Sequence, residues 1–213
     1  MKNIVCFGDS NTFGFKLSNF KRYQASERWT GILKERLKLE YRIKEEGLNG
    51  RTIAIEDPFQ DGLCGFQDIE VCLMKHKPVS LLVVMLGTND TKELYQASVS
   101  MIKDNLREFL LNVKQLDCWD KEANILVVAP KAINQEYQTK CFGESMGRGC
   151  DIKSAQLPKE FKEVARGLGC HYLDANDYIS QLEELDGIHL TVEGHQQLAK
   201  AMEEKIKEVF KKI

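Results

Sequence analysis

The chain alternates short apolar runs rich in β-branched residues with longer amphipathic stretches, and this alternation limits the folds open to it. Strands are predicted at residues 3–7, 41–46, 80–86, 124–129 and 170–173. Strands that alternate with helices are typical of a parallel sheet covered on both faces. No repeat, low-complexity tract or linker divides the 213 residues. We therefore expect one domain over residues 1–213, built as a three-layer α/β/α sandwich around a five-stranded parallel sheet.

The amphipathic stretches predict where the helices lie. A candidate capping box of Asp90 and Glu93 precedes a long helix with an apolar face of Ile102, Leu106, Phe109, Leu110, Val113 and Leu116. Thr191 is the expected N-cap of the last helix, whose apolar face contains Leu198, Met202, Ile206, Val209, Phe210 and Ile213. Further helices are expected at 29–39, 67–76 and 158–167.

Residues 131–154 form the longest stretch without a predicted element, and they are rich in polar residues and glycine. In an α/β fold this stretch leaves the carboxyl end of a strand, which is where ligands bind. Two interpretations stay open, a wall or lid of an active site and a featureless surface excursion.

Charge and hydropathy argue against several kinds of partner. The formal net charge is −2, and Lys and Arg are spread along the chain, so there is no electrostatic footprint for nucleic acid or an anionic membrane. No apolar stretch approaches the roughly 18 residues of a membrane span, and the first residues lack the apolar region of a signal peptide. We expect a cytoplasmic protein with neither partner.

The cysteines and histidines indicate neither a disulfide framework nor a metal site. The seven cysteines are odd in number and contain no C-x-x-C pair, so neither a disulfide framework nor a zinc site is indicated. His76, His171 and His195 are not at metal-ligand spacings. Reduced thiols and no metal are expected.

The sequence FGDSNTFG, residues 7–14, follows the first predicted strand and could either bind phosphate or present a nucleophile. It lacks the spacing of a Walker loop and the G-x-G-x-x-G dinucleotide pattern. A hydroxyl-rich turn can still bind phosphate, so a flavodoxin-like module that holds FMN or another phosphate ligand stays open from this stretch alone. The other interpretation is that the stretch presents Ser10 as a nucleophile.

Three further stretches are predicted near the same sheet edge: GLNGRT (47–52), GTND (87–90) and DGIH (186–189). Nucleophilic acyl transfer needs a hydroxyl, a base, an acid that orients the base, and fixed donors for the oxyanion.

These stretches contain each of those parts. His189 can accept the proton of Ser10 at neutral pH, and Asp186, three residues earlier, can reach back to the imidazole. Gly50 can present a backbone N–H without a Cβ, and Asn89 offers a side-chain amide.

The four blocks, in this order over essentially the whole chain, resemble those of the SGNH, or GDSL-type, hydrolase family. The resemblance implies that Ser10 is the nucleophile, His189 the general base and Asp186 its orienting acid. It also implies an oxyanion hole made of the Ser10 N–H, the Gly50 N–H and the Asn89 amide. A flavodoxin-like fold with the active site at the carboxyl edge of the sheet is expected, without a cofactor.

Within that family, the sequence is most similar to the arylesterase and acetyl-esterase branch, through NTFG (11–14), ERWTG (27–31), GRT (50–52) and DP (57–58). The resemblance implies hydrolysis of short-chain aryl or acetyl esters, small-molecule substrates, through an acyl-serine intermediate. A thioesterase or lysophospholipase acting on longer acyl chains is the alternative. Relatives in this branch often assemble, so a homo-oligomer stays open from the resemblance. Asn11 stands where the family name has leucine, and we expect it to affect pocket shape more than mechanism.

Overall fold

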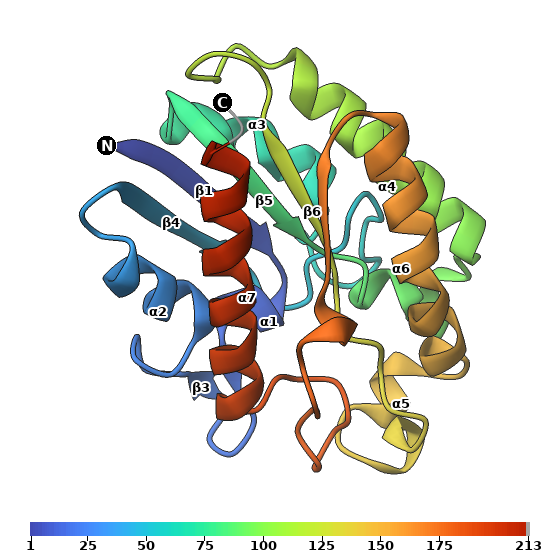
Figure 1. Ribbon diagram of the computed structural model, residues 1–213. Coiled ribbons are helices and arrows are strands. Elements are labelled where there is room, and N and C mark those ends of the chain that lie inside the picture. Colours follow the sequence, from blue (N-terminus) through green and yellow to red (C-terminus); the bar gives the residue numbers. More distant parts are fainter. Residues whose placement is uncertain (212–213) are drawn as a thin grey trace.

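A computed structural model of the chain describes residues 1–211 (Figure 1). Its centre is a five-stranded sheet in which every neighbouring pair is parallel. In spatial order, the strands are β4 (Tyr41–Gly47), β1 (Lys2–Gly8), β5 (Val79–Met85), β6 (Ile125–Ala129) and β7 (His171–Asp174). This is the 2-1-3-4-5 order of flavodoxin-like folds. The predicted fold class is therefore confirmed, and each predicted strand matches to within one residue at either end.

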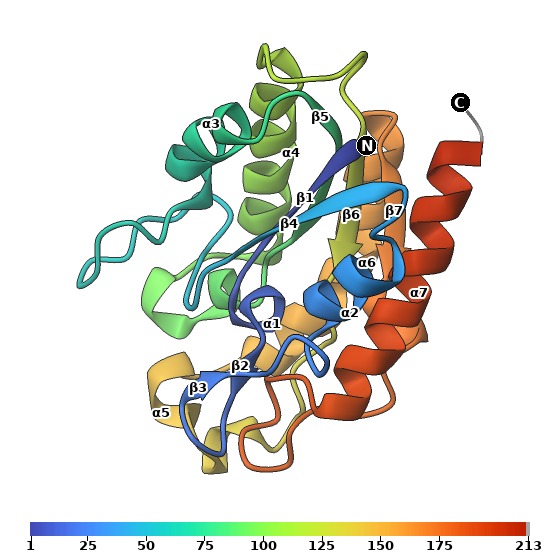
Figure 2. The ribbon, with the colours of Figure 1, turned by 90° about the vertical axis from the view of Figure 1, so that its left-hand side faces the viewer.

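Helices cover both faces of the sheet. One face carries α2 (Trp29–Arg36) and α7 (Val192–Lys211). The other face carries α3 (Gly65–Lys75), α4 (Val99–Gln115) and α6 (Cys150–Gly167). Figure 2 shows α7 and α3 on opposite sides of the strands.

Two separate cores result from the pleat of the strands. Successive side chains of a strand point to opposite faces. In β1, Ile4 and Cys6 pack into the core under α2 and α7, whereas Val5 and Phe7 pack into the core under α3, α4 and α6. All four side chains are fully buried, which is why these strands appear in the sequence as continuous apolar runs.

The apolar faces predicted for the two long helices are confirmed within the described residues. In α4 the buried residues are Ile102, Leu106, Phe109, Leu110 and Val113, and Leu116 follows as a partly buried C-cap. Thr191 caps α7 by accepting a hydrogen bond from the Gly194 N–H at 2.9 Å. The apolar face predicted for α7 is buried at Leu198, Met202, Ile206 and Val209, and Phe210 is partly buried. Ile213 lies outside the described residues.

The predicted capping box is wrong. Helix α4 begins at Val99, and Ser98 caps it by accepting a hydrogen bond from the Met101 N–H at 3.2 Å. Asp90 and Glu93 lie upstream, in the short 3-10 helices η1 (Asn89–Thr91) and η2 (Glu93–Tyr95). The Asp90 carboxylate is used elsewhere, because it is buried and accepts the N–H of Ile53.

Helix α6 is longer than predicted, because it begins at Cys150 and continues through Pro158. The rest of segment 131–154 contains η3 (Tyr137–Thr139) and the one-turn helix α5 (Gly143–Met146). A small unpredicted hairpin joins β2 (Phe15–Lys16) to β3 (Lys21–Arg22).

These short elements gather below the carboxyl ends of the strands, together with α1 (Ser10–Phe13) (Figure 2). A further 3-10 turn, η4 (Ala175–Asp177), follows β7. Among residues 1–211, no helix is long and apolar enough to cross a membrane.

Candidate active site

Ser10 lies at the turn between β1 and α1. Asp9 caps the helix, since its Oδ1 accepts a hydrogen bond from the Asn11 N–H at 2.9 Å. Ser10 is the first residue of α1, so its own backbone N–H has no partner within the helix. A Cβ at Gly8 would lie 2.1 Å from the Thr12 Oγ1, which explains why glycine precedes the turn.

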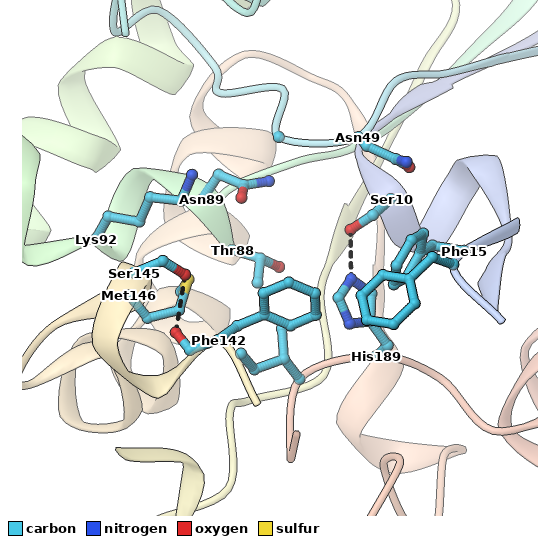
Figure 3. A pocket seen from close by; sticks show the side chains of 13 residues that line it. Ser10, Phe15, Asn49, Thr88, Asn89, Lys92, Phe142, Ser145, Met146 and His189 are labelled. Atoms are coloured by element: carbon cyan, nitrogen blue, oxygen red, sulfur yellow. Dashed lines mark hydrogen bonds between the residues drawn. The ribbon is translucent and has the colours of Figure 1, made fainter. Parts of the chain in front are cut away.

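The structure brings Ser10, His189 and Asp186 together in one line of contacts. The His189 Nε2 lies 2.9 Å from the Ser10 Oγ (Figure 3). On the other side of the ring, the His189 Nδ1 lies 2.5 Å from the Asp186 Oδ2. The other carboxylate oxygen of Asp186 accepts the backbone N–H groups of Ile188 at 2.8 Å and His189 at 3.0 Å. The carboxylate therefore fixes both the ring and the backbone of His189.

Asp186 is fully buried, which by itself raises the pKa of a carboxyl group. Hydrogen bonds from the His189 ring and from two backbone N–H groups, with the attraction to His189, outweigh that effect and hold the pKa of Asp186 below its ordinary value. Asp186 is therefore ionised at neutral pH. An ionised partner favours the imidazole tautomer with its proton on Nδ1, which leaves Nε2 free to accept the Ser10 proton.

The two remaining candidate residues face the same cavity as Ser10. Gly50 lies in the turn after β4 with a φ of +84°, a conformation that favours glycine. Asn89 follows β5, and its Nδ2 donates one hydrogen bond to the Arg51 carbonyl at 3.1 Å. An amide nitrogen carries two hydrogens, so one N–H of Asn89 remains for a ligand.

The cavity beside Ser10 has a volume of about 280 Å³. Its polar side is formed by Ser10, Asn49, Gly50, Thr88, Lys92, Asn89, Ser145 and His189 (Figure 3). Its apolar side is formed by Phe15, Phe20, Phe142, Met146 and Ile188.

Segment 131–154 contributes Phe142, Ser145 and Met146 to this cavity. The Phe142 ring centroid lies 5.8 Å from that of His189, and the Phe15 ring centroid lies 4.8 Å from it. The structure thus favours the wall interpretation of this segment over a featureless excursion. Neither phenylalanine was predictable from sequence, since neither belongs to a run with a hydrophobic period.

Asn11 does not shape the pocket, so this expectation is corrected. Its side chain is buried and does not line the cavity. The Asn11 Oδ1 accepts the Leu190 N–H at 2.9 Å, and the Nδ2 donates to the Ile188 carbonyl at 3.4 Å. These two backbone groups flank His189, so Asn11 connects the nucleophile turn to the segment that carries the imidazole.

Arg51 is a second residue whose contribution the sequence did not reveal. Its buried guanidinium donates to the carbonyls of Gly8 at 3.1 Å and Glu46 at 2.6 Å. It therefore ties together the carboxyl ends of β1 and β4, and the Gly50 turn follows β4 directly.

Two further carboxyl groups at the carboxyl edge of the sheet have perturbed pKa values. Burial is the main cause in both, and it raises the pKa of Asp9 to about 6 and that of Asp90 to about 7. The two groups also repel each other, which adds to the raised pKa of Asp90.

Comparisons with known proteins agree with this geometry. Residues 6–197 match the GDSL-like Lipase/Acylhydrolase family. A comparison with curated proteins found no match. An aryl esterase of M. smegmatis is similar in structure, with 28% identity, a TM-score of 0.90, and 98% of this chain and 100% of that chain covered. A carbohydrate acetylesterase from Sinorhizobium meliloti is similar too, with 31% identity, a TM-score of 0.90 and the same coverage.

A more distant structure, the lipase/acylhydrolase from Enterococcus faecalis, has 19% identity and a TM-score of 0.69 over 98% of this chain and 96% of that chain, and it shares the fold. The family match spans most of the chain and carries the serine, glycine, asparagine and histidine blocks. The chain belongs to the GDSL-like lipase/acylhydrolase family and is a carboxylic ester hydrolase.

Proposed function

We propose that the protein hydrolyses short-chain aryl or acetyl esters through an acyl-Ser10 intermediate. The observation that carries this proposal is the line of contacts from Asp186 through His189 to Ser10, with distances of 2.5 and 2.9 Å, which opens into the cavity. A base held at hydrogen-bond distance from a hydroxyl, and itself oriented by a carboxylate, is the arrangement that activates a serine.

In the proposed acylation, the Ser10 Oγ attacks the ester carbonyl while its proton passes to the His189 Nε2. Asp186 stays ionised and stabilises the imidazolium that forms. The negative charge on the carbonyl oxygen is met by the N–H groups of Ser10, Gly50 and Asn89. Collapse of this intermediate expels the alcohol, which takes the proton from Nε2. Water then attacks the acyl-serine with His189 again as the base, which releases the acid and restores Ser10.

The size and lining of the cavity support small substrates. Its volume of about 280 Å³ lies at the lower end of the range for ligand pockets. The phenyl rings of Phe15 and Phe142 face His189, where they can contact an apolar part of an ester. The similar aryl esterase and carbohydrate acetylesterase add support for aryl or acetyl esters.

A panel of aryl esters with acyl groups from acetyl to octanoyl tests the substrate class. The acetyl and propionyl esters should give the highest kcat/KM, in line with the aryl esterase and the carbohydrate acetylesterase that the chain resembles. A kcat/KM that rises with chain length would instead favour the thioesterase or lysophospholipase alternative. The phosphate-binding module considered from the sequence drops out, since the chain is an ester hydrolase.

Covalent labelling tests the nucleophile separately. A fluorophosphonate should add once per chain, at Ser10, because an activated serine attacks phosphorus readily at neutral pH. The label should be absent in Ser10→Ala. A label that persists in this variant would assign the nucleophile to another residue.

A further inference from the structure

A second group of reactive side chains lies outside the cavity. Glu46, Cys72 and His76 each offer one ligand atom, and these three atoms lie within 4.8 Å of one another. None of the three lines the cavity around Ser10. We propose that Glu46, Cys72 and His76 form a zinc-binding site that joins strand β4 to helix α3.

The secondary structure explains why these side chains meet. Cys72 lies in the last turns of α3, and His76 follows the last residue of that helix. Side chains four residues apart on a helix lie one above the other on the same face. Glu46, near the end of β4, reaches them from the edge strand of the sheet, and its Oε1 lies 2.5 Å from the His76 Nε2.

The backbone on both sides is held in place. The His76 carbonyl accepts a hydrogen bond from the Asn3 Nδ2 at 3.1 Å. Glu46 is in register with Phe7 of β1, and its backbone carbonyl accepts a hydrogen bond from the Arg51 guanidinium. Only the side chains would need to adjust, and a metal site on fixed elements is better defined than one on loops.

The Glu46–His76 pair needs only a small adjustment. Zinc binds imidazole nitrogen and carboxylate oxygen at about 2.0–2.2 Å with tetrahedral angles, so the two ligand atoms end up roughly 3.3 Å apart. The Glu46 carboxylate would therefore withdraw from the His76 ring by less than about 1 Å. The side chains of His76 and Glu46 are 11% and 23% exposed, which leaves the site shielded but open to a water molecule as the fourth ligand.

The donor set and its charge suit Zn²⁺. Thiolate, imidazole and carboxylate are the three ligand types that zinc accepts. On binding, the Cys72 thiol proton passes to solvent as the sulfur–zinc bond forms, and His76 coordinates through Nε2 in its neutral form with its proton on Nδ1. One thiolate and one carboxylate then balance the charge of the ion.

Two cations lie near the site, and neither blocks it. The Lys75 Nζ is 3.2 Å from the Glu46 Oε1, but its side chain is 65% exposed and can turn into solvent, and surface ion pairs of this kind contribute little. Burial raises the pKa of the Cys72 thiol to about 12, and the charge of Arg51 acts against that rise. Arg51 is paired with Asp68 at 3.6 Å and donates to two backbone carbonyls. It keeps these partners when the metal binds.

The sequence did not predict this site, because it contains no C-x-x-C pair and no pair of histidines at ligand spacing. Cys72 and His76 become a pair only when 67–76 is seen as one helical face, and the third ligand comes from a strand that is distant in the sequence. A metal bound there would link the edge strand β4 to helix α3. It would take no part in ester hydrolysis.

Titration of chelator-treated protein with Co²⁺ tests the proposal, because cobalt occupies zinc sites and its bond to a thiolate gives a charge-transfer absorption. One equivalent of Co²⁺ should produce this absorption, and Zn²⁺ should abolish it. Ser10, His189 and Asp186 include no thiol, so metal bound there stays silent. Zn²⁺ at about a hundredfold excess over its Kd should also raise the melting temperature by roughly 5–10 °C.

Three variants make the test specific. Cys72→Ser should lose both the absorption and the melting shift, whereas the matched Cys141→Ser, at an exposed thiol, should keep both. Glu46→Gln retains the thiol and should weaken Co²⁺ binding by more than about tenfold, which decides the question if Cys72→Ser does not fold by circular dichroism. The proposal is overturned if the wild-type protein shows no absorption, if Cys72→Ser keeps it, or if Glu46→Gln binds Co²⁺ like the wild type.

Discussion

The side-chain amide of Asn89 carries two N–H groups that can each donate a hydrogen bond. One N–H donates to the Arg51 carbonyl at 3.1 Å, and the other remains for a ligand in the cavity that Asn89 lines together with Ser10. Asn89→Ala should lower kcat by about 10²–10³ with KM little changed, because a donor that acts on the oxyanion stabilises the transition state more than bound substrate. Steady-state kinetics on an acetyl aryl ester measures both constants.

Stability is the control for Asn89→Ala. The variant loses one buried hydrogen bond, so its free energy of unfolding should fall by only about 1 kcal/mol. Because Ser98 caps α4, helix α4 should not fray. Fluorophosphonate labelling should continue, more slowly, at Ser10. A kcat close to that of the wild type would exclude Asn89 as an oxyanion donor.

Asn11 is expected to act on the reaction through His189. Asn11→Leu would leave the Leu190 N–H and the Ile188 carbonyl without their partner, which should cost about 1–3 kcal/mol of stability. A displaced imidazole no longer matches the Ser10 Oγ, so kcat should fall by about 10–100-fold while KM changes little. Asn11→Asp keeps an acceptor for the Leu190 N–H and should lose less of both. A change in KM alone would return Asn11 to a role in pocket shape.

Among the elements, the start of helix α4 is set by Ser98. Its Oγ accepts the Met101 N–H, so Ser98→Ala should lower the free energy of unfolding by about 1 kcal/mol and leave kcat unchanged. Ser100→Ala, at an exposed site two residues further along the same helix, is the matched control and should not destabilise. Urea denaturation measures both variants. Equal stabilities for the two would mean that Ser98 does not contribute as a cap.

Elements with a strong hydrophobic period were predictable from sequence, and elements defined by polar contacts were not. The strands are buried on both faces, so continuous apolar runs locate them to within a residue. The start of α4 was misplaced because Asp90 and Glu93 satisfy the local capping pattern. Asp90, however, makes its bond to Ile53, across a distance in sequence that no local rule covers.

The candidate site divides in the same way. The motif blocks were predictable as neighbours, because the carboxyl ends of parallel strands share one edge of the sheet. The contact between Asp186 and His189 followed from their short spacing. The phenylalanines that line the cavity were not predictable. Phe20 and Phe142 adopt left-handed φ values of 55° and 66°, which their residue type does not favour. The bonds of Asn11 to the His189 segment join residues 177 and 179 positions apart, which only the tertiary fold reveals.

For the whole molecule, self-association stays a prediction from the resemblance. Sedimentation velocity at several concentrations measures it directly. The cavity around Ser10 is complete within one chain, so catalysis as proposed needs no second copy.

The dependence of stability on pH combines buried groups with opposite effects. Burial raises the pKa of Asp90 to about 7, so between about pH 4 and pH 7 the folded chain holds a proton that the unfolded chain has lost. Stability therefore falls as pH rises through this window. His195 acts in the opposite direction: burial, with the charge of His189, lowers its pKa to about 3, so the unfolded chain binds the extra proton below its ordinary pKa. That contribution is lost as pH falls from about 6.5 toward 3.

Asp90→Asn separates these opposing effects. The asparagine oxygen can still accept the Ile53 N–H, so the variant should fold with the same bond, but it no longer has a group that titrates. Relative to the wild type, its free energy of unfolding should increase by about 2–3 kcal/mol between pH 5 and pH 7.5, because each pH unit in the window is worth about 1.4 kcal/mol. Two neighbouring charges also act on the pKa of Asp90 and so on the size of this difference. Asp9 raises that pKa by repulsion, and Lys92 lowers it by attraction. Urea denaturation of both proteins at several pH values measures the difference. Two curves that stay parallel across this range would show that Asp90 keeps the same protonation state throughout it.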